Sequence, residues 1–361
     1  MSEKKRYNIT YLLGAGASAK AIPIVNEFSQ ILIQMKDLLE ICESDLRDRN
    51  QNDLIVGVQR LKKNLLLLLN EIDRFGTVDT YAKMLVLQGR EEEIGELKIT
   101  LGIIFTFFQE CKDRRNMAGI PIHKNMVLQN KEMIDGRYAG LLANLLVKEN
   151  GKIEIPSNIN ILSWNYDLQL EKSLQMFLGS KQLHDVFNLV GIYPEISEHK
   201  ILKDPRIIHL NGIAGVVDSA GTKSTNSMLT RIKNSTNTNE VISNLAVFYS
   251  FFERMQIDPN LRMSFAWEDT EIAKTARQEA IAIMKRTNVL VVIGYSFPGF
   301  NLDVDRQLFE AFKTKGKEHT AIFYQDKSPN IELIRDSFGV AADKIIAHEN
   351  VDQFLIPRQY L

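Results

Sequence analysis

The fold is decided by the stretch Leu12-Leu13-Gly14-Ala15-Gly16-Ala17-Ser18. It follows the apolar run Ile9 to Leu13, which predicts a buried strand, and it precedes a segment rich in helix formers. Two glycines between a strand and a helix let the backbone come close to a phosphate, which the amides at the helix N-terminus can bind. For this loop by itself, a tight strand–helix turn without a ligand is the alternative.

Further apolar runs along the chain predict more strands, at residues 159–163, 206–210, 288–294 and 320–324. The run at 288–294, NVLVVIG, is continuous and β-branched, which is typical of a central parallel strand that is covered on both faces. Helical periodicity lies between these runs, as at 303–313 and 331–337. The alternation predicts an α/β fold built on a Rossmann-like, doubly wound parallel sheet.

A long helical block separates the first strand from the others. Its apolar spacing predicts helices from about residue 26, over 54–75, from 79, over 94–111 and near 133–148, the last ending at a Glu-Asn-Gly turn. We therefore expect a sheet domain of residues 1–26 and 152–361 and an inserted all-helical subdomain of residues 27–151. A Gly-Ile-Pro break is expected at 119–121 and a long polar loop at 218–240.

Composition narrows the class of protein. The 361 residues carry a net charge of -1, so no basic surplus points to direct nucleic-acid binding. The two cysteines, Cys42 and Cys111, exclude a disulfide framework and a four-cysteine zinc site, and they suit a reducing cytoplasm. The polar residues 1–6 predict no targeting segment, and no apolar run reaches the roughly 20 residues of a membrane span. The apolar runs at 65–69 and 103–108 predict a helical core, with subunit contacts as the alternative.

Polar side chains follow three of the predicted strands. Asn165 and Asp167 come directly after the run at 159–163, at alternate positions that face the same way. An amide and a carboxylate together suit a ligand such as a carboxamide, although a helix cap explains one of the two equally well. Because ligands of open parallel sheets bind at the carboxyl ends of the strands, one shared site is predicted.

Two more segments belong to this expected site. His209 follows an apolar strand, where a histidine can act as a general base near neutral pH, while a structural role is the alternative. Gly294-Tyr295-Ser296 follows NVLVVIG and offers backbone amides and a hydroxyl. An ordinary strand–helix turn capped by Ser296 is the competing interpretation.

Taken together, these segments resemble the sirtuin-like NAD-binding domain over residues 8–28 and 159–326. The family's motifs are matched by Gly14 to Ser18, Ile22-Pro23, Asn165 with Asp167, and Gly294 with Ser296, with Ala21 in place of the usual glycine. The chain is similar to the bacterial sirtuin-like proteins of antiphage defence, which hydrolyse NAD.

The sequence departs from the family's pattern at two points. It cannot build the four-cysteine zinc module of deacetylating sirtuins, which disfavours deacetylation and a metal. Where the family shows Leu-His-Gly, this chain reads His209-Leu210-Asn211-Gly212, which puts Asn211 in the histidine's place. His209 lies two residues earlier and faces the same side of an extended backbone, so we expect it to be the base. If Asn211 holds that place instead, the protein binds NAD without cleaving it.

The resemblance implies hydrolysis of the nicotinamide N-glycosidic bond, with NAD as substrate and with nicotinamide and ADP-ribose as products. Asn165 would orient the ribose hydroxyls and water, Asp167 would hold the carboxamide, and His209 would take a proton. Contacts to the rest of the dinucleotide are assigned to Gly14, Ala15, Gly16, Ser18, Pro23, Asn211, Gly212, Gly294, Ser296 and Asn301. The first four would cradle the pyrophosphate, and Ser296 would contact the adenosine side.

An NAD hydrolase requires control, which the resemblance assigns to homo-oligomerisation or to a partner such as a HerA-type ATPase. That ATPase would be a separate polypeptide, because this chain has no Walker-type GxxxxGK[ST] loop. Three other functions remain open from the sequence. They are a non-catalytic NAD or ADP-ribose sensor or regulatory subunit, a deacylase without zinc, and an unrelated Rossmann reductase.

Overall fold

The computed structural model describes residues 6–110, 131–149, 151–180, 183–195, 206–218, 225–227, 260–313 and 321–361. The chain forms two compact units. The first, here called the sheet unit, comprises Met1–Ala19, Asp135–Ile213 and Ser264–Leu361. The second unit comprises Lys20–Ile134 and Ala214–Met263. The domain limits expected from the sequence, at residues 26 and 151, stay a prediction.

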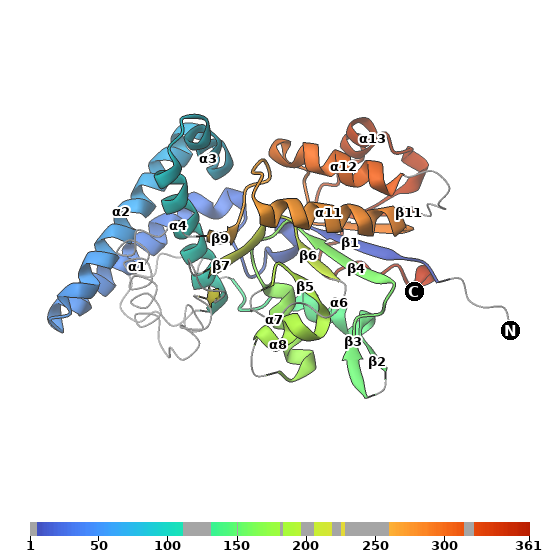
Figure 1. Cartoon of the computed structure of the whole chain (residues 1–361), viewed down its shortest axis with the longest axis horizontal. Helices are drawn as coiled ribbons and strands as arrows, with labels where there is room; N and C mark the ends of the chain where they lie inside the picture. The colour runs from blue at the N-terminus through green and yellow to red at the C-terminus, as the bar shows by residue number, and fades with distance from the viewer. Residues whose placement is uncertain are drawn as a thin grey trace. The chain divides into compact units, whose positions relative to one another are not determined.

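A seven-stranded parallel sheet is the centre of the sheet unit (Figure 1). Its order is β12 (Ile345–His348), β11 (Ala321–Gln325), β10 (Val289–Ile293), β1 (Ile9–Leu13), β4 (Ile159–Ser163), β6 (Ile207–His209) and β5 (Ile192–Tyr193). The chain extends the sheet from β1 in one direction and from β10 in the other. The carboxyl ends of β1 and β10 therefore form the switch point at which open α/β sheets bind ligands. The predicted α/β class with a parallel sheet is confirmed.

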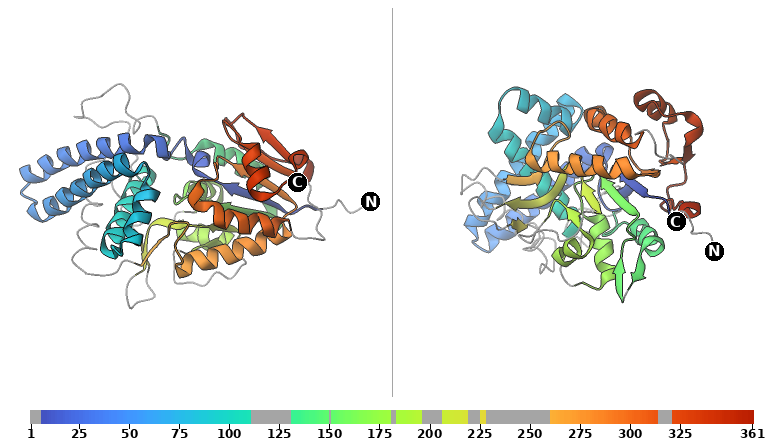
Figure 2. Two further views of the ribbon diagram at one scale, coloured as in Figure 1. Left: turned by 90° about the horizontal axis from the view of Figure 1, so that it is seen from above. Right: turned by 45° about the vertical axis from the view of Figure 1, so that its right-hand side comes forward.

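Helices cover both faces of this sheet (Figures 1 and 2). One face carries α6 (Gly136–Leu145), α7 (Gln169–Leu178) and α8 (Leu183–Val190). The other carries α11 (Glu271–Arg286), α12 (Leu302–Phe312) and α13 (Ile331–Phe338). On this second face Leu12, Leu162 and Leu290 pack in one apolar core with Ile283 and Phe309. Burial on both faces is why these strands read as continuous apolar runs.

The predicted helix near residues 133–148 is wrong at its C-terminal end. α6 stops at Leu145, and the chain continues as a hairpin of β2 (Val147–Glu149) and β3 (Lys152–Glu154). Gly151 in its connection has a φ of 81°, a conformation that glycine adopts without steric cost. An Asn-Gly pair in a sequence is a strong hairpin signal, and Gly151 lies in the connection of a hairpin rather than at the end of a helix.

Short elements complete the sheet unit. The single-turn helices are η1 (Ala15–Ser18), η3 (Gly299–Asn301), η4 (Ala342–Lys344) and η5 (Arg358–Tyr360). The first follows β1 directly and contains the glycine turn. The helix η3 follows β10 through the segment Gly294–Pro298, so η1 and η3 both flank the switch point.

The second unit contains η2 (Val25–Glu27), α1 (Phe28–Asp48), α2 (Asn52–Phe75), α3 (Val78–Leu87) and α4 (Glu91–Glu110), as the apolar spacing predicted. It also includes a three-stranded sheet in the order β8 (Thr225–Ser227), β7 (Gly212–Asp218) and β9 (Asn260–Met263). Ile103, Ile104, Phe107 and Phe108 are fully buried, so the run at 103–108 forms core. In the run at 65–69, the neighbouring Leu66 and Leu67 are both 41% exposed. The break expected at 119–121 and most of the loop expected at 218–240 lie outside the described residues.

A buried carboxylate ties α1 to α2. Glu43 on α1 accepts hydrogen bonds from Gln59 and Lys62 on α2 and from Arg47 one turn further along its own helix. These bonds, the one from Gln59 foremost, lower the pKa of Glu43 to about 2. Among the described residues, no helix is long and apolar enough to cross a membrane.

Candidate functional site

The glycine turn after β1 packs backbone against backbone on the turn after β10. The amide of Gly14 donates to the carbonyl of Ile293 at 3.0 Å, and the amide of Gly16 donates to the carbonyl of Gly294 at 2.8 Å. A Cβ atom on Gly14 would lie 2.6 Å from the Gly294 oxygen, and one on Gly16 would lie 2.8 Å from the Gly294 Cα. Both glycines are therefore required by this close approach, whether or not a ligand is bound.

The same contact limits what the turn can offer a phosphate. Three of its amides, those of Gly14, Gly16 and Ala17, already donate to carbonyls of the protein. Ala15 between them is exposed, so the outer surface of the turn remains open to a ligand. The turn also stands at the N-terminus of η1, next to the switch point between β1 and β10.

Three predicted site residues are joined by hydrogen bonds at the carboxyl ends of β1 and β4. The Ser18 hydroxyl donates to Asp167 Oδ1 at 3.0 Å. The Asn165 amide donates to the Gly14 carbonyl at 2.9 Å and reaches the Ser18 hydroxyl at 3.3 Å. Ser18, Asn165 and Asp167 are 1%, 8% and 5% exposed, so the cluster is built into the fold rather than held by surface side chains.

Burial changes the acidity of Asp167. Desolvation raises the pKa of this carboxyl to about 6, against the opposing effect of the bonds from the Gln169 amide and the Ser18 hydroxyl. Both of those bonds end on Oδ1, and Oδ2 accepts none from any residue that the structure describes. At neutral pH Asp167 is thus a carboxylate with one oxygen available and with a pKa suited to proton transfer.

Both ring nitrogens of His209 contact other protein atoms, whereas a general base needs one nitrogen free for the substrate. Its Nδ1 lies 2.9 Å from the carbonyl of Asn165, and its Nε2 lies 2.8 Å from Oε1 of Glu171 on α7. His209 and Glu171 are 1% and 0% exposed. Desolvation lowers the pKa of His209, but the Glu171 charge and hydrogen bond outweigh it, so the pKa is raised overall. With both nitrogens donating to the protein, this ring orients Asn165 and accepts no further proton in this conformation.

We expect Glu171→Gln to destabilise the sheet unit by about 2 kcal/mol at pH 6, because it uncouples a buried charge from His209. The stabilisation from a raised histidine pKa is fully present below the unfolded value of about 6.5 and is lost as the pH rises through the higher folded value. The difference from wild type should therefore shrink at pH 9. Urea unfolding at the two pH values measures it, and a difference that does not change with pH would show that His209 is not charged in this pair.

Asn211 and Gly212 follow β6, the neighbour of β4 in the sheet. The Asn211 carbonyl accepts a bond from the Ser264 amide at 2.8 Å. Its side chain is 7% exposed, and Oδ1 is buried without a hydrogen-bond partner in the described structure. A buried amide oxygen that lacks a partner is costly, and a ligand donor would satisfy it.

The remaining predicted residues separate into three groups. Gly294 packs on the glycine turn, and Ser296 after it is exposed. Asn301 donates to the Tyr295 hydroxyl at 3.0 Å, which donates to Asp305 at 2.7 Å, so its amide serves an internal network. Pro23 belongs to the second unit.

Three residues at the site were missed from the sequence. Glu171 lies in the first turn of α7, and Arg137 and Tyr138 lie at the start of α6. Tyr138 contacts Ser18, and Arg137 contacts the carbonyls of Gly16 and Ala17. A charged residue at the start of an amphipathic helix is usually solvated, so no local pattern distinguishes these three from surface residues.

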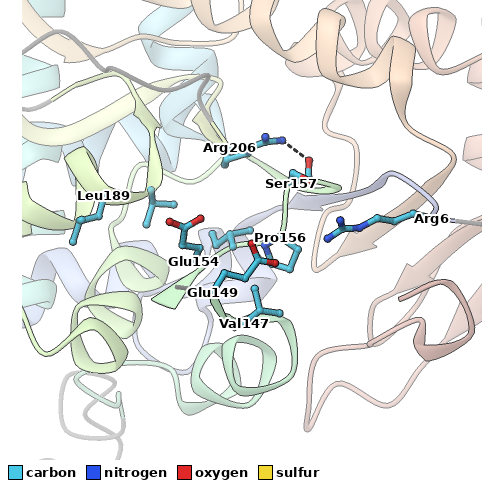
Figure 3. Close-up of a pocket in the computed structure, with 10 residues that line it drawn as sticks. Arg6, Val147, Glu149, Glu154, Pro156, Ser157, Leu189 and Arg206 are labelled. Atoms are coloured by element: carbon cyan, nitrogen blue, oxygen red, sulfur yellow. Dashed lines mark hydrogen bonds between the residues drawn. The ribbon is translucent and has the colours of Figure 1, made fainter. Parts of the chain in front are cut away.

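A cavity of about 290 Å³ lies at the opposite edge of the sheet (Figure 3). Arg6, Ser157 and Arg206 in its wall precede β1, β4 and β6, which puts it at the amino ends of these strands. The other lining residues are Val147, Glu149, Glu154, Ile155, Pro156, Leu189 and Val190. No predicted site residue lines this cavity.

No family model matches the chain, and no curated protein matches it. Within the described ranges there is no group of three or more His, Cys, Asp or Glu side chains placed to hold a metal ion.

Proposed function

We propose that the sheet unit is a sirtuin-like NAD-binding domain that hydrolyses the nicotinamide N-glycosidic bond of NAD, giving nicotinamide and ADP-ribose. The observation that carries the proposal is the hydrogen-bonded cluster of Ser18, Asn165 and Asp167 beside the glycine turn. It combines a buried carboxylate and a buried amide with a backbone turn at the switch point of a parallel sheet.

The chemistry of the bond favours a carboxylate at this place. Cleavage passes through a transition state with positive charge on the ribose, as in glycoside hydrolysis. A fixed negative charge near the ribose stabilises that state, and the Asp167 pKa of about 6 suits proton removal from water or a ribose hydroxyl. In this proposal Asp167 takes the role that the sequence suggested for His209, and Asn165 orients the ribose hydroxyls.

His209 then acts through Asn165. Its ring, charged by the pairing with Glu171, holds the Asn165 carbonyl and with it the turn that carries Asp167. The Asn211 amide oxygen, which lacks a partner in the described structure, would accept a bond from the dinucleotide. This division of roles needs no metal and no peptide groove.

A second candidate function is binding of NAD or ADP-ribose without cleavage, as a sensor or regulatory subunit. The engaged ring of His209 favours it, because the histidine of the sequence motif has no nitrogen left for the substrate. The two candidates share the binding site and differ only in turnover.

Two measurements on the purified full chain separate these functions. Nicotinamide release from NAD is followed by chromatography, and binding of NAD and ADP-ribose is followed by calorimetry. Release together with binding supports the hydrolase. Binding without release supports the sensor if release is absent both from the isolated chain and from the chain mixed with its candidate partner ATPase. Absence of both, with the chain folded, would refute the proposed site. Glu149→Gln in the opposite cavity is a matched control that should change neither measurement.

Control of the activity is part of the proposal. Depletion of NAD harms the cell that carries the enzyme, so activity in antiphage defence would depend on a second copy of this chain or on a separate ATPase. Light scattering of the purified chain with and without NAD tests the first of these. Release that is constant from monomer to oligomer would exclude self-association as the control.

A further inference from the structure

Arg137, at the start of α6, is a buried side chain that forms hydrogen bonds with the glycine turn. Its guanidinium donates to the carbonyls of Gly16 and Ala17 at 3.0 and 3.3 Å, and to that of Val351 at 3.1 Å. It also donates to both carboxylate oxygens of Asp135, at 2.8 and 2.5 Å. Arg137 is 7% exposed and Asp135 is 0% exposed, so the pair is desolvated and its geometry is fixed by five bonds.

Tyr138, the next residue, reaches the other end of the same turn. Its hydroxyl lies 3.0 Å from that of Ser18. The single hydrogen of Ser18 is donated to Asp167, so Tyr138 is the donor in this contact and Ser18 the acceptor. The bonds therefore run in one direction, from Tyr138 through Ser18 to the carboxylate. Tyr138 is 1% exposed, and its ring packs edge to face on Phe354 at 5.1 Å.

We propose that Arg137 and Tyr138 are positioning residues of the nucleotide site, which hold the Gly14–Ser18 turn and the Ser18 hydroxyl in the geometry that the ligand requires. The inference rests on the proposed function for its ligand. Neither residue contacts the dinucleotide in this arrangement. Arg137 acts through the carbonyls of the turn, and Tyr138 acts through Ser18.

The chain of bonds makes a property of Asp167 depend on Tyr138. Hydrogen bonds that point the same way polarise one another, so the tyrosine strengthens the bond from Ser18 to the carboxylate. That bond favours the charged form of Asp167. The other groups around Asp167 are the Gln169 amide and Glu171 on α7 and His209 on β6. Burial raises the pKa of the Tyr138 hydroxyl well above 10. The negative charges of Asp167, Asp135 and Glu171 raise this pKa further.

The test of Tyr138 is a carbon-13 NMR titration of aspartate carboxyls in the full chain without ligand. Tyr138→Phe removes the donor but keeps the ring, and we expect the pKa of Asp167 to rise above its value near 6. Tyr193→Phe is the matched control, because that hydroxyl donates to the Ile272 carbonyl and should leave Asp167 unchanged. An unchanged titration in Tyr138→Phe would overturn the role of Tyr138.

The test of Arg137 uses Arg137→Lys, which keeps the charge but loses the planar fork that reaches several carbonyls at once. We expect faster hydrogen exchange in residues 14–19 and about tenfold weaker binding of NAD and of ADP-ribose. For Tyr138→Phe we expect about fivefold weaker binding at pH 7. Binding as tight as wild type in both variants, or an equal loss in Tyr193→Phe, would refute the positioning role.

The two proposals fail in different ways. The NMR titration and the exchange measurement need no ligand, so they report on Arg137 and Tyr138 even if the wild type does not bind NAD. Wild-type chain that binds neither NAD nor ADP-ribose would overturn the proposed function alone. Unchanged Asp167 titration and turn exchange, in variants of a chain that does bind NAD, would overturn the positioning role alone.

Discussion

Replacing Gly294 by alanine is expected to destabilise the sheet unit by about 4 kcal/mol. The new Cβ would lie 2.5 Å from the amide nitrogen of Ala17 and from the carbonyl carbon of Gly16, both of which are backbone atoms that cannot rotate away. Gly294 also has a φ of 59°, a region that costs an alanine about 1 kcal/mol. Since domains are typically stable by only about 5–15 kcal/mol, this loss is a large part of the total.

Urea denaturation followed by tryptophan fluorescence measures this effect. The chain's two tryptophans, Trp164 and Trp267, both belong to the sheet unit, so the signal reports its unfolding. Gly299→Ala is the matched control in the same loop, because a Cβ there meets nothing within 4 Å, and it should change stability by no more than about 0.5 kcal/mol. Equal stability of Gly294→Ala and the control would show that the two turns do not pack as described.

Asp167→Asn is expected to lower nicotinamide release about a thousandfold. The asparagine oxygen can still accept the bonds from Ser18 and from the Gln169 amide, so the turn keeps its shape. What the variant loses is the negative charge that the proposed mechanism places near the ribose, together with the ability to take a proton. Chromatography of nicotinamide at saturating NAD measures the change, and turnover at the wild-type rate would remove Asp167 from the mechanism.

The pH dependence of nicotinamide release and of stability, compared between the wild type and Asp167→Asn, provides a second readout. Wild-type release should fall as the pH drops through about 6, because Asp167 becomes protonated there. A carboxyl whose pKa is raised on folding contributes stability that is complete below the unfolded value of about 3.9 and is lost as the pH rises through the folded value. At pH 7 the free energy of unfolding of Asp167→Asn should therefore be at least as large as that of the wild type, although the variant releases far less nicotinamide.

Asp326→Asn is the control for Asp167→Asn. Asp326 follows β11 and accepts a bond from the Ser328 amide in its own turn, so it is a carboxylate after a parallel strand without a contact to the cluster. It should keep full release and the wild-type pH profile. A loss of activity in Asp326→Asn would mean that any charge at this edge of the sheet affects turnover, and the assignment of Asp167 would fall.

Local sequence was enough to predict most of the elements. The run at 288–294 becomes β10 because it is apolar on both faces, which is typical of a covered parallel strand, and the shorter run at 159–163 becomes β4. The helix over 54–75 follows from its apolar stripe in the same way. Where two local signals compete, as at Asn150-Gly151, the pattern was insufficient, since the choice between a helix end and a hairpin depends on what the following strand pairs with.

The candidate site shows the limit of the same reasoning. Strand ends were sufficient to predict that the glycine turn, Asn165 and Asp167 come together, because the carboxyl ends of parallel strands meet at one edge of the sheet. They did not reveal the pairing of His209 with Glu171, a helical residue 38 positions earlier whose approach is a matter of packing. The bond from Asn301 to the Tyr295 hydroxyl could not be foreseen for the same reason, and the assignment of Asn301 to the dinucleotide stays a prediction.

The amino-acid sequence by itself determined the class of fold and the presence of a glycine turn after the first strand, because both follow from short-range patterns of size and hydrophobicity. Only the tertiary structure decided which residues that turn contacts. Gly14 and Gly16 pack against Gly294, Arg137 donates to the Gly16 carbonyl, and the Tyr138 hydroxyl contacts that of Ser18. Such contacts join residues more than a hundred positions apart, and their energy comes from close packing and desolvated hydrogen bonds that no local pattern encodes.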